Sequence, residues 1–191
     1  MRFKLIATIF TVSLLIVATS FGDEKKDEEN RQKIRKMATQ TLQDLYKLQP
    51  ASKAAIHKSA GYAVFNNMGT KILLLSTARG AGIAVDSKTK QETFMKMISA
   101  GGGLGVGVTE YNVVFAFENQ AALNQFLNSG WSGSAEADAA AKTSTKGGAY
   151  AGAVQVNPGV WVYQITKKGL ALSLTLQGTK YYKDDDLNNN K

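Results

Sequence analysis

The sequence predicts an α+β protein in which a curved antiparallel sheet or partial barrel packs with N-terminal helices and one later helix. Three observations lead to this class. Apolar residues recur at helical spacing from residue 34 to 48 and stop before Pro50. Short apolar runs separated by turn residues follow between 62 and 117. Residues 170–177 alternate between leucine and small or polar side chains, which is typical of a strand with one buried face.

The first 22 residues have the layout of a secretory signal peptide. Arg2 and Lys4 precede an apolar run over 5–18, and small residues precede Asp23. The apolar run is short for a membrane span, although retention as an N-terminal anchor is the alternative. We therefore expect cleavage after the leader and export to the periplasm or the medium. A charged lead-in over 23–33 is expected to be frayed.

Helices and strands are then expected in alternation with turn signals. After the helix that ends at Pro50, a short helix over 52–60 is closed by Gly61. A later helix begins at Asn119 and ends at Gly130. Segment 131–148 is small and polar and reads as a loop. Strands are expected over 62–65, 71–76, 81–86, 92–99, 112–117, 149–156, 160–166 and 170–177.

Composition excludes several classes of function. The chain has no cysteine, which excludes disulfides, thiolate metal sites, cysteine nucleophiles and the lipid-modified cysteine of a bacterial lipoprotein. His57 is the single histidine, and no Gly-x-Ser-x-Gly motif accompanies it. We expect no catalytic residue, cofactor or metal site. The net charge of +8 predicts attraction to polyanions such as anionic lipid headgroups, unless the charge serves solubility alone.

The glycine cluster over 101–107 decides whether a nucleotide site is present. No register of the cluster satisfies Gly-x-Gly-x-x-Gly, and the residues after it are typical of a strand rather than a helix. We interpret Gly103, Gly105 and Gly107 as structural glycines on one strand face. Such a row predicts close approach by another strand, a helix or a ligand.

These landmarks together resemble the SYLF domain family in its bacterial exported branch. The resemblance is carried by 59–65, by 78–82, by the glycine strand, by Phe115-Ala116-Phe117 and Gly130-Trp131, and by 162–164 with 177–182. The resemblance covers about residues 35–188, and we expect one SYLF-like domain over 34–183 with a polar tail over 184–191. It implies a non-catalytic module that binds anionic lipid. The eukaryotic branch also binds actin filaments, but export of this chain argues against actin as its partner.

The sequence departs from the family pattern at several positions. Ala171 and Ser173 stand where members commonly carry Phe and Gly, and Gln177 stands where an acidic residue is common. The cysteine through which many bacterial relatives are lipid-anchored is also absent. Both departures weaken any inference of membrane tethering.

Basic residues beside aromatic side chains or turns are the best binding candidates, because such sites suit the membrane interface. The candidates are Lys33, Arg35, Lys36, Arg79, Lys167, Lys168 and Lys180. The leading hypothesis is binding of anionic lipid or another polyanion, with no nucleic acid expected. The alternative is a structural protein that engages an unknown protein partner through a sheet edge or an apolar groove, its charge being incidental.

Overall fold

The computed structural model describes residues 3–133, 149–171 and 178–189, and the side-chain surroundings of all of these except 3–23 and 102–105. The predicted α+β class is confirmed, because the sheet curls into an antiparallel half-barrel with helices against it. The helices are α1 (Phe3–Leu48), α2 (Ala51–Lys58), α3 (Gln120–Ser129) and α5 (Asp185–Asn188). The strands are β1 (Gly61–Asp86), β2 (Glu92–Phe117), β3 (Trp131–Ser132), β4 (Val154–Asn157), β5 (Val160–Thr166), β6 (Gly169–Ala171) and β7 (Thr179–Lys183).

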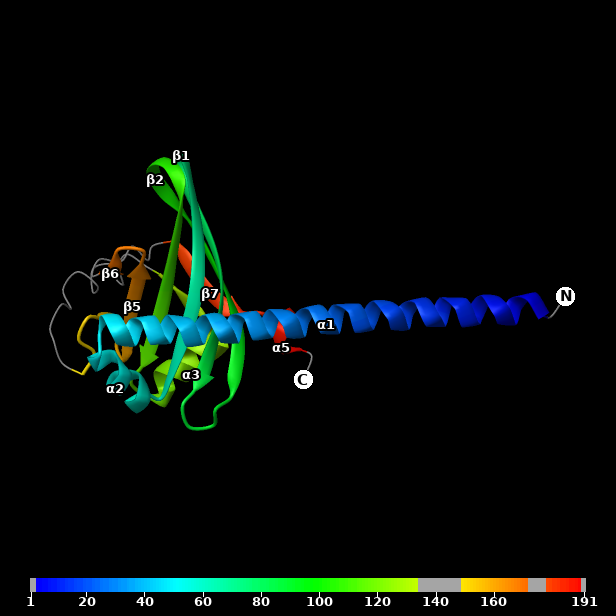
Figure 1. The fold of residues 1–191 in the computed structure, drawn as a ribbon, viewed down its shortest axis with the longest axis horizontal. Coiled ribbons are helices and arrows are strands. Elements are labelled where there is room, and N and C mark those ends of the chain that lie inside the picture. Colours follow the sequence, from blue (N-terminus) through cyan, green and yellow to red (C-terminus); the bar gives the residue numbers. More distant parts are fainter. Residues whose placement is uncertain (1–2, 134–148, 172–177, 190–191) are drawn as a thin grey trace.

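Strands β1 and β2 form one long ribbon that folds over itself. They pair antiparallel along their whole length of 26 residues each, from Gly61–Phe117 to Val85–Glu92. The middle of both strands forms an apex at the top of the molecule, far from the turn that joins them (Figure 1). Strand β7 pairs with β2 over 95–99, and β5 pairs with β2 over 111–117. The folded ribbon therefore supplies both halves of the curled sheet.

Glycines allow the two halves of β1 to approach one another closely. A Cβ added to Gly82 would overlap the ring of Phe65 and the carbonyl oxygen of Val64. A Cβ added to Gly80 would overlap the buried side chain of Asn67. Residues with side chains would hold these segments apart, so the fold of the ribbon depends on glycine here.

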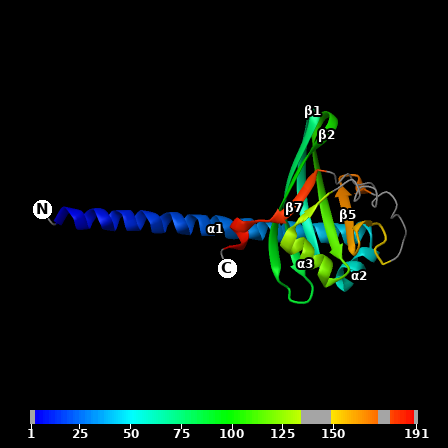
Figure 2. The same ribbon diagram turned by 180° about the vertical axis from the view of Figure 1, so that it is seen from behind.

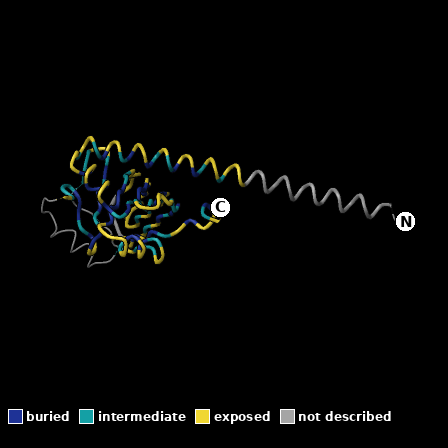
Figure 3. The backbone as a smooth tube through the Cα atoms, turned by 90° about the horizontal axis from the view of Figure 1, so that it is seen from below, coloured by how far each residue is buried: buried dark blue, intermediate teal, exposed yellow. Residues whose placement is uncertain are grey.

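The curled sheet has a core on each face. Helix α3 lies against one face (Figure 2). Its residues Leu123 and Phe126 belong to a core that includes the aromatic rings of Phe65, Phe115 and Tyr181. The other face is covered by α1. Ile34, Ala38 and Leu45 repeat at helical spacing and are buried against this face, whereas the outward side of α1 is exposed (Figure 3). Each helix therefore packs its apolar side against one face of the sheet and leaves its polar side exposed.

Two predicted turns are absent from the observed strand pattern. Residues 66–69 and 78–80 were expected to separate short strands, yet both segments lie inside β1. The pairing with β2 continues across them, since the ladder hydrogen bonds outweigh the local turn preference of asparagine and glycine. The turn expected at 87–90, the helix that begins after Asn119 and the glycine segment as a strand are confirmed.

The N-terminal helix is longer than expected. In place of a frayed lead-in over 23–33, α1 is continuous from Phe3. Its charged residues favour the helix through local pairs, such as Arg31 with Glu28 at 3.3 Å. Within the part of the chain that the structure describes, no helix combines the length and apolar character needed to cross a membrane.

The expected polar tail is packed in part. Asp184 is buried and accepts a hydrogen bond from the backbone of Leu187, which caps α5. The carbonyl oxygen of Leu187 in turn accepts a hydrogen bond from Arg31 at 3.0 Å. The tail is therefore attached to α1 as far as residue 189, and residues 190–191 lie outside the described part.

Candidate functional site

A groove runs between α1 and the two halves of β1. Its floor is mostly apolar and comes from Ile34 and Met37 of α1 and from Met68 and Ala81 of β1. The groove encloses about 400 Å³. Successive residues of a strand point to opposite faces of the sheet. Met68 and Ala81 are on the face of β1 that is turned toward α1.

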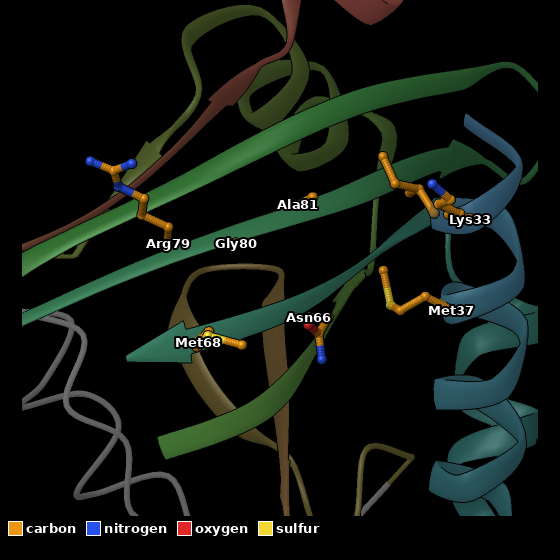
Figure 4. Close-up of a pocket in the computed structure, with 8 residues that line it drawn as sticks. Lys33, Met37, Asn66, Met68, Arg79, Gly80 and Ala81 are labelled. Atoms are coloured by element: carbon orange, nitrogen blue, oxygen red, sulfur yellow. The ribbon is translucent and has the colours of Figure 1, made fainter. Parts of the chain in front are cut away.

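Two of the predicted cations lie at opposite ends of this groove (Figure 4). Lys33 reaches it from α1, and Arg79 reaches it from the second half of β1. Both side chains are exposed, and neither has an acidic partner among the residues described. Lys33 and Arg79 are 46 residues apart in the sequence, so the sequence did not show that they are close in space. Their proximity depends on the packing of α1 against the folded ribbon.

A second hollow of about 960 Å³ continues from the same walls toward α5. It shares Lys33, Ile34 and Arg79 with the groove and adds Lys96 and Tyr182. In this hollow, the positive charge of Lys96 is neutralised by two aspartates of the same chain. The ammonium of Lys96 lies 2.8 Å from Asp184 and 2.9 Å from Asp186, and these hydrogen bonds raise its pKa.

Arg35 has a structural role instead. Its guanidinium pairs with Glu92 at 2.8 Å and with Glu28 at 3.3 Å, and it lies over the ring of Phe94. These contacts fasten α1 to β2. The pKa of Glu28 is lowered chiefly by its hydrogen bond from Arg31, with further contributions from Gln32 and Arg35.

The remaining predicted cations lie apart from the groove. Lys36 is exposed on α1 and lines neither hollow. Lys167 and Lys168 occupy the exposed β5–β6 turn, where Lys167 lies 3.4 Å from Glu110. Lys180 is exposed on β7 in the same rung of the sheet as Ile98 and Arg79, so that all three side chains share one face.

The close approach predicted for the glycine row is not found at Gly107. A Cβ added to Gly107 would meet no atom within 4 Å. Gly103 and Gly105 belong to the segment 102–105, whose side-chain surroundings lie outside the described part. The close approaches occur at Gly80 and Gly82 instead.

Sequence reasoning missed an exposed apolar surface in the middle of the β1–β2 ribbon. The run over 71–76 was expected to be a strand with no assignment of its burial, and in the structure Leu73, Leu74 and Leu75 are each about 70% exposed. The signal that could have revealed this was the glycine cluster. Glycines stand opposite these residues in the ribbon and provide no side chain to cover them.

Titratable groups do not gather into a reaction centre in the described part of the chain. His57 is exposed on α2, and Asp86 is engaged by backbone and side-chain donors at the end of β1. No group of three or more potential metal ligands occurs among the described residues.

Comparison with known families agrees with these landmarks. Residues 98–191 match the Ysc84 family, described as Las17-binding protein actin regulator. This match confirms the predicted resemblance to the SYLF family. The family defines a lipid- or actin-binding type of module.

A curated relative extends the likeness over most of the chain. This chain is 38% identical over 164 residues to Beta cell expansion factor A of Aeromonas veronii. The aligned region covers 85% of this chain and 60% of that protein. The chain thus spans about three fifths of the length of this curated relative.

Proposed function

We propose that this chain is an exported, non-catalytic module that binds anionic lipid headgroups through the cations of the α1–β1 groove. The observation that carries the proposal is the position of Lys33 and Arg79, which have no acidic partner in the described part of the chain, at the ends of an apolar groove. A lipid phosphate suits a guanidinium or ammonium group, and the adjoining glycerol and acyl carbons suit the methionine-lined floor.

Family and charge support the same proposal. The SYLF family is a lipid- or actin-binding type of module, so lipid and actin are the ligands that the family resemblance favours. The signal-peptide pattern over 1–22 favours the envelope as the setting, where anionic lipid is abundant and actin is not. Attraction between headgroups and surface cations extends over a Debye length of about 10 Å at 0.1 M salt, so binding should weaken as salt rises.

Vesicle co-sedimentation tests the proposal. The protein should sediment with phosphatidylcholine vesicles that contain phosphatidylglycerol and poorly with phosphatidylcholine alone. Each engaged cation contributes about 1 kcal/mol, so loss of both should weaken binding about 30-fold. The double reversal Lys33→Glu with Arg79→Glu should therefore abolish most sedimentation at low salt.

A matched control carries the same charge change elsewhere. Lys53 and Lys58 are exposed on α2, outside the groove. Their double reversal to Glu should reduce binding only modestly. A third variant, Lys167→Glu with Lys168→Glu, tests the β5–β6 turn as a separate contact. Equal loss in all variants would assign binding to net charge alone, and no sedimentation by the unmodified protein would favour a protein partner.

A further inference from the structure

The apex of the folded ribbon is an exposed apolar surface. We define it as Ile72, Leu73, Leu74, Leu75, Val106 and Val108, which are between 61% and 82% exposed. Among the described residues, the other large apolar side chains with high exposure are Leu48, Met68 and Ile98. Apolar exposure is therefore concentrated where the ribbon projects furthest from the sheet (Figure 1). A concentrated apolar surface indicates an interaction site.

The apex is apolar on both faces of the ribbon. Ile72 and Leu73 are consecutive, so their side chains leave opposite faces. Val106 stands opposite Ile72 and Val108 opposite Thr70, which extends one face across both strands. A partner with a flat surface would cover only one of the two faces. A fluid of acyl chains covers both.

Strand pairing continues through most of the apex, and few charged residues lie near it. Strand pairing continues through Ile72–Val106 and Leu73–Gly105 and resumes at Leu75–Gly102. This pairing satisfies the backbone donors and acceptors that face the partner strand, which are about half of those in a two-stranded ribbon. Segments 69–78 and 97–109 contain one charged residue, Lys71, and no acidic residue.

Cations lie within the apex and at its base. Lys71 pairs with Gly107, between Val106 and Val108, and its long side chain can extend toward the headgroups. The β5–β6 turn brings Lys167 to within 3.4 Å of Glu110, two residues from Val108. Met68, which lines the groove, lies four residues before Ile72 on the same face of β1. The five steps along β1 from Met68 to Leu73 span about 16 Å. This reach is close to half of a hydrocarbon core of about 30 Å.

We infer that the apex inserts among the acyl chains of a lipid bilayer while the groove cations stay at headgroup depth. The inference rests on the proposed function, which it deepens by assigning the apolar contact. Lipid attraction through the groove is screened by salt, whereas apolar insertion is not. The two contributions are therefore separable by experiment.

Depth measurement tests the inference directly. Because the chain has no cysteine, Leu74→Cys provides a single site for an environment-sensitive fluorophore. Gln91→Cys is the matched control, since Gln91 is exposed in the turn at the opposite end of the same ribbon. With vesicles of phosphatidylcholine and phosphatidylglycerol, the label at 74 should shift to the blue and be quenched by lipids brominated deep in their chains. The label at 91 should do neither.

Binding by an unlabelled variant provides the second measurement. Leu74→Ser with Leu75→Ser removes apolar surface from exposed positions, so the fold should persist. This variant should bind the same vesicles at least tenfold more weakly and lose all binding in high salt. Leu48→Ser, an exposed change at the end of α1, should bind as the unmodified protein does.

The outcomes separate this inference from the proposed function. Sedimentation that depends on Lys33 and Arg79, with the label at 74 remaining in water, overturns insertion and leaves headgroup binding standing. Absence of sedimentation at low salt overturns both. A dimer in lipid-free solution that dissociates on the Leu74→Ser and Leu75→Ser changes would assign the apex to self-association and also overturn insertion.

Discussion

Glycines of the β1–β2 ribbon have two different roles, which the space around each residue distinguishes. Gly80 and Gly82 lie where β1 passes close to itself, and an added Cβ would overlap Asn67 or Phe65. Gly101 and Gly107 lie near the apex, where an added Cβ would meet nothing within 4 Å. The first pair permits the fold, whereas the second pair leaves the apex uncovered.

Gly82→Ala should therefore destabilise the protein, whereas Gly107→Ala should not. Overpacking against a backbone oxygen and a buried ring typically costs about 1–3 kcal/mol. Alanine at the open position should raise the free energy of unfolding by up to about 1 kcal/mol, because glycine loses more backbone entropy in a strand. Denaturant unfolding of both variants measures the contrast. Equal destabilisation would contradict the assignment of open space at Gly107.

Leu73 is held in a backbone conformation that leucine disfavours. Its φ is 57°, in the left-handed region, at the irregularity where the ribbon folds. This conformation costs an L-residue about 1–2 kcal/mol. Its side chain is 70% exposed, so burial of apolar surface offsets little of this conformational free energy.

Leu73→Gly should leave stability unchanged or raise it by up to about 1 kcal/mol, since glycine adopts the left-handed region freely. The same variant should bind vesicles less well, because it removes one apolar side chain from the apex. Thermal unfolding and co-sedimentation of one preparation measure both effects. A large fall in the melting temperature would show that Leu73 contributes to the core in a way its exposure does not indicate.

The turn between β1 and β2 is held by one carboxylate. Asp86 accepts hydrogen bonds from the backbone of Lys88 and Thr89, and Gln120 of α3 donates to its other oxygen, each at 2.8 Å. These donors, the Thr89 backbone first and Gln120 next, lower the pKa of Asp86 from 3.8 to about 2. The ionised form is therefore the stabilising one, and it joins the ribbon to α3.

Asp86→Ala should lower the melting temperature at neutral pH. A carboxylate whose pKa is depressed on folding stabilises the protein above its unfolded pKa, and this contribution is lost as pH falls through the folded value. The difference between the unmodified protein and the variant should thus shrink between about pH 4 and pH 2. Melting temperatures measured across that range provide the test, and a difference that is constant with pH would contradict it.

At the scale of the whole molecule, the sheet and its core do not depend on the first part of α1. Among the α1 residues whose burial is described, 24–48, the first that are buried against the fold are Arg31 and Ile34. Without Arg2 and Lys4, the basic count falls from 23 to 21 against 15 acidic residues, so the net charge changes from +8 to +6. Removal of the predicted leader would therefore leave both the core and the basic character in place.

We expect protein extracted from the cell envelope to lack residues 1–22. Intact-mass measurement tests this expectation, and a mass that includes the leader would support its retention as an anchor. A chain that begins at Asp23 should have the same melting temperature as the full chain, because it keeps all of the buried residues that the structure describes. A marked loss of stability would contradict the boundary.

The sequence by itself determined the ends of α3 and the β5–β6 turn, because these depend on residues that are adjacent along the chain. Asn119 and Gly130 bound α3 as their capping preferences predict, and Lys167-Lys168-Gly169 forms the β5–β6 turn. The α+β class and the SYLF resemblance also followed from local patterns. All seven predicted cations were identifiable by type, though not by surroundings.

Only the tertiary structure decided which residues act together. The turn signals at 66–69 and 78–80 yielded to pairing with β2, which lies more than 15 residues away along the chain. Lys33 and Arg79 share a groove because α1 packs across the folded ribbon, whereas Arg35, two residues from Lys33, is occupied by Glu92. The exposure of Leu73–Leu75 depends on glycines in the opposite strand. Burial and ion pairing are properties of non-local contacts, which local periodicity does not encode.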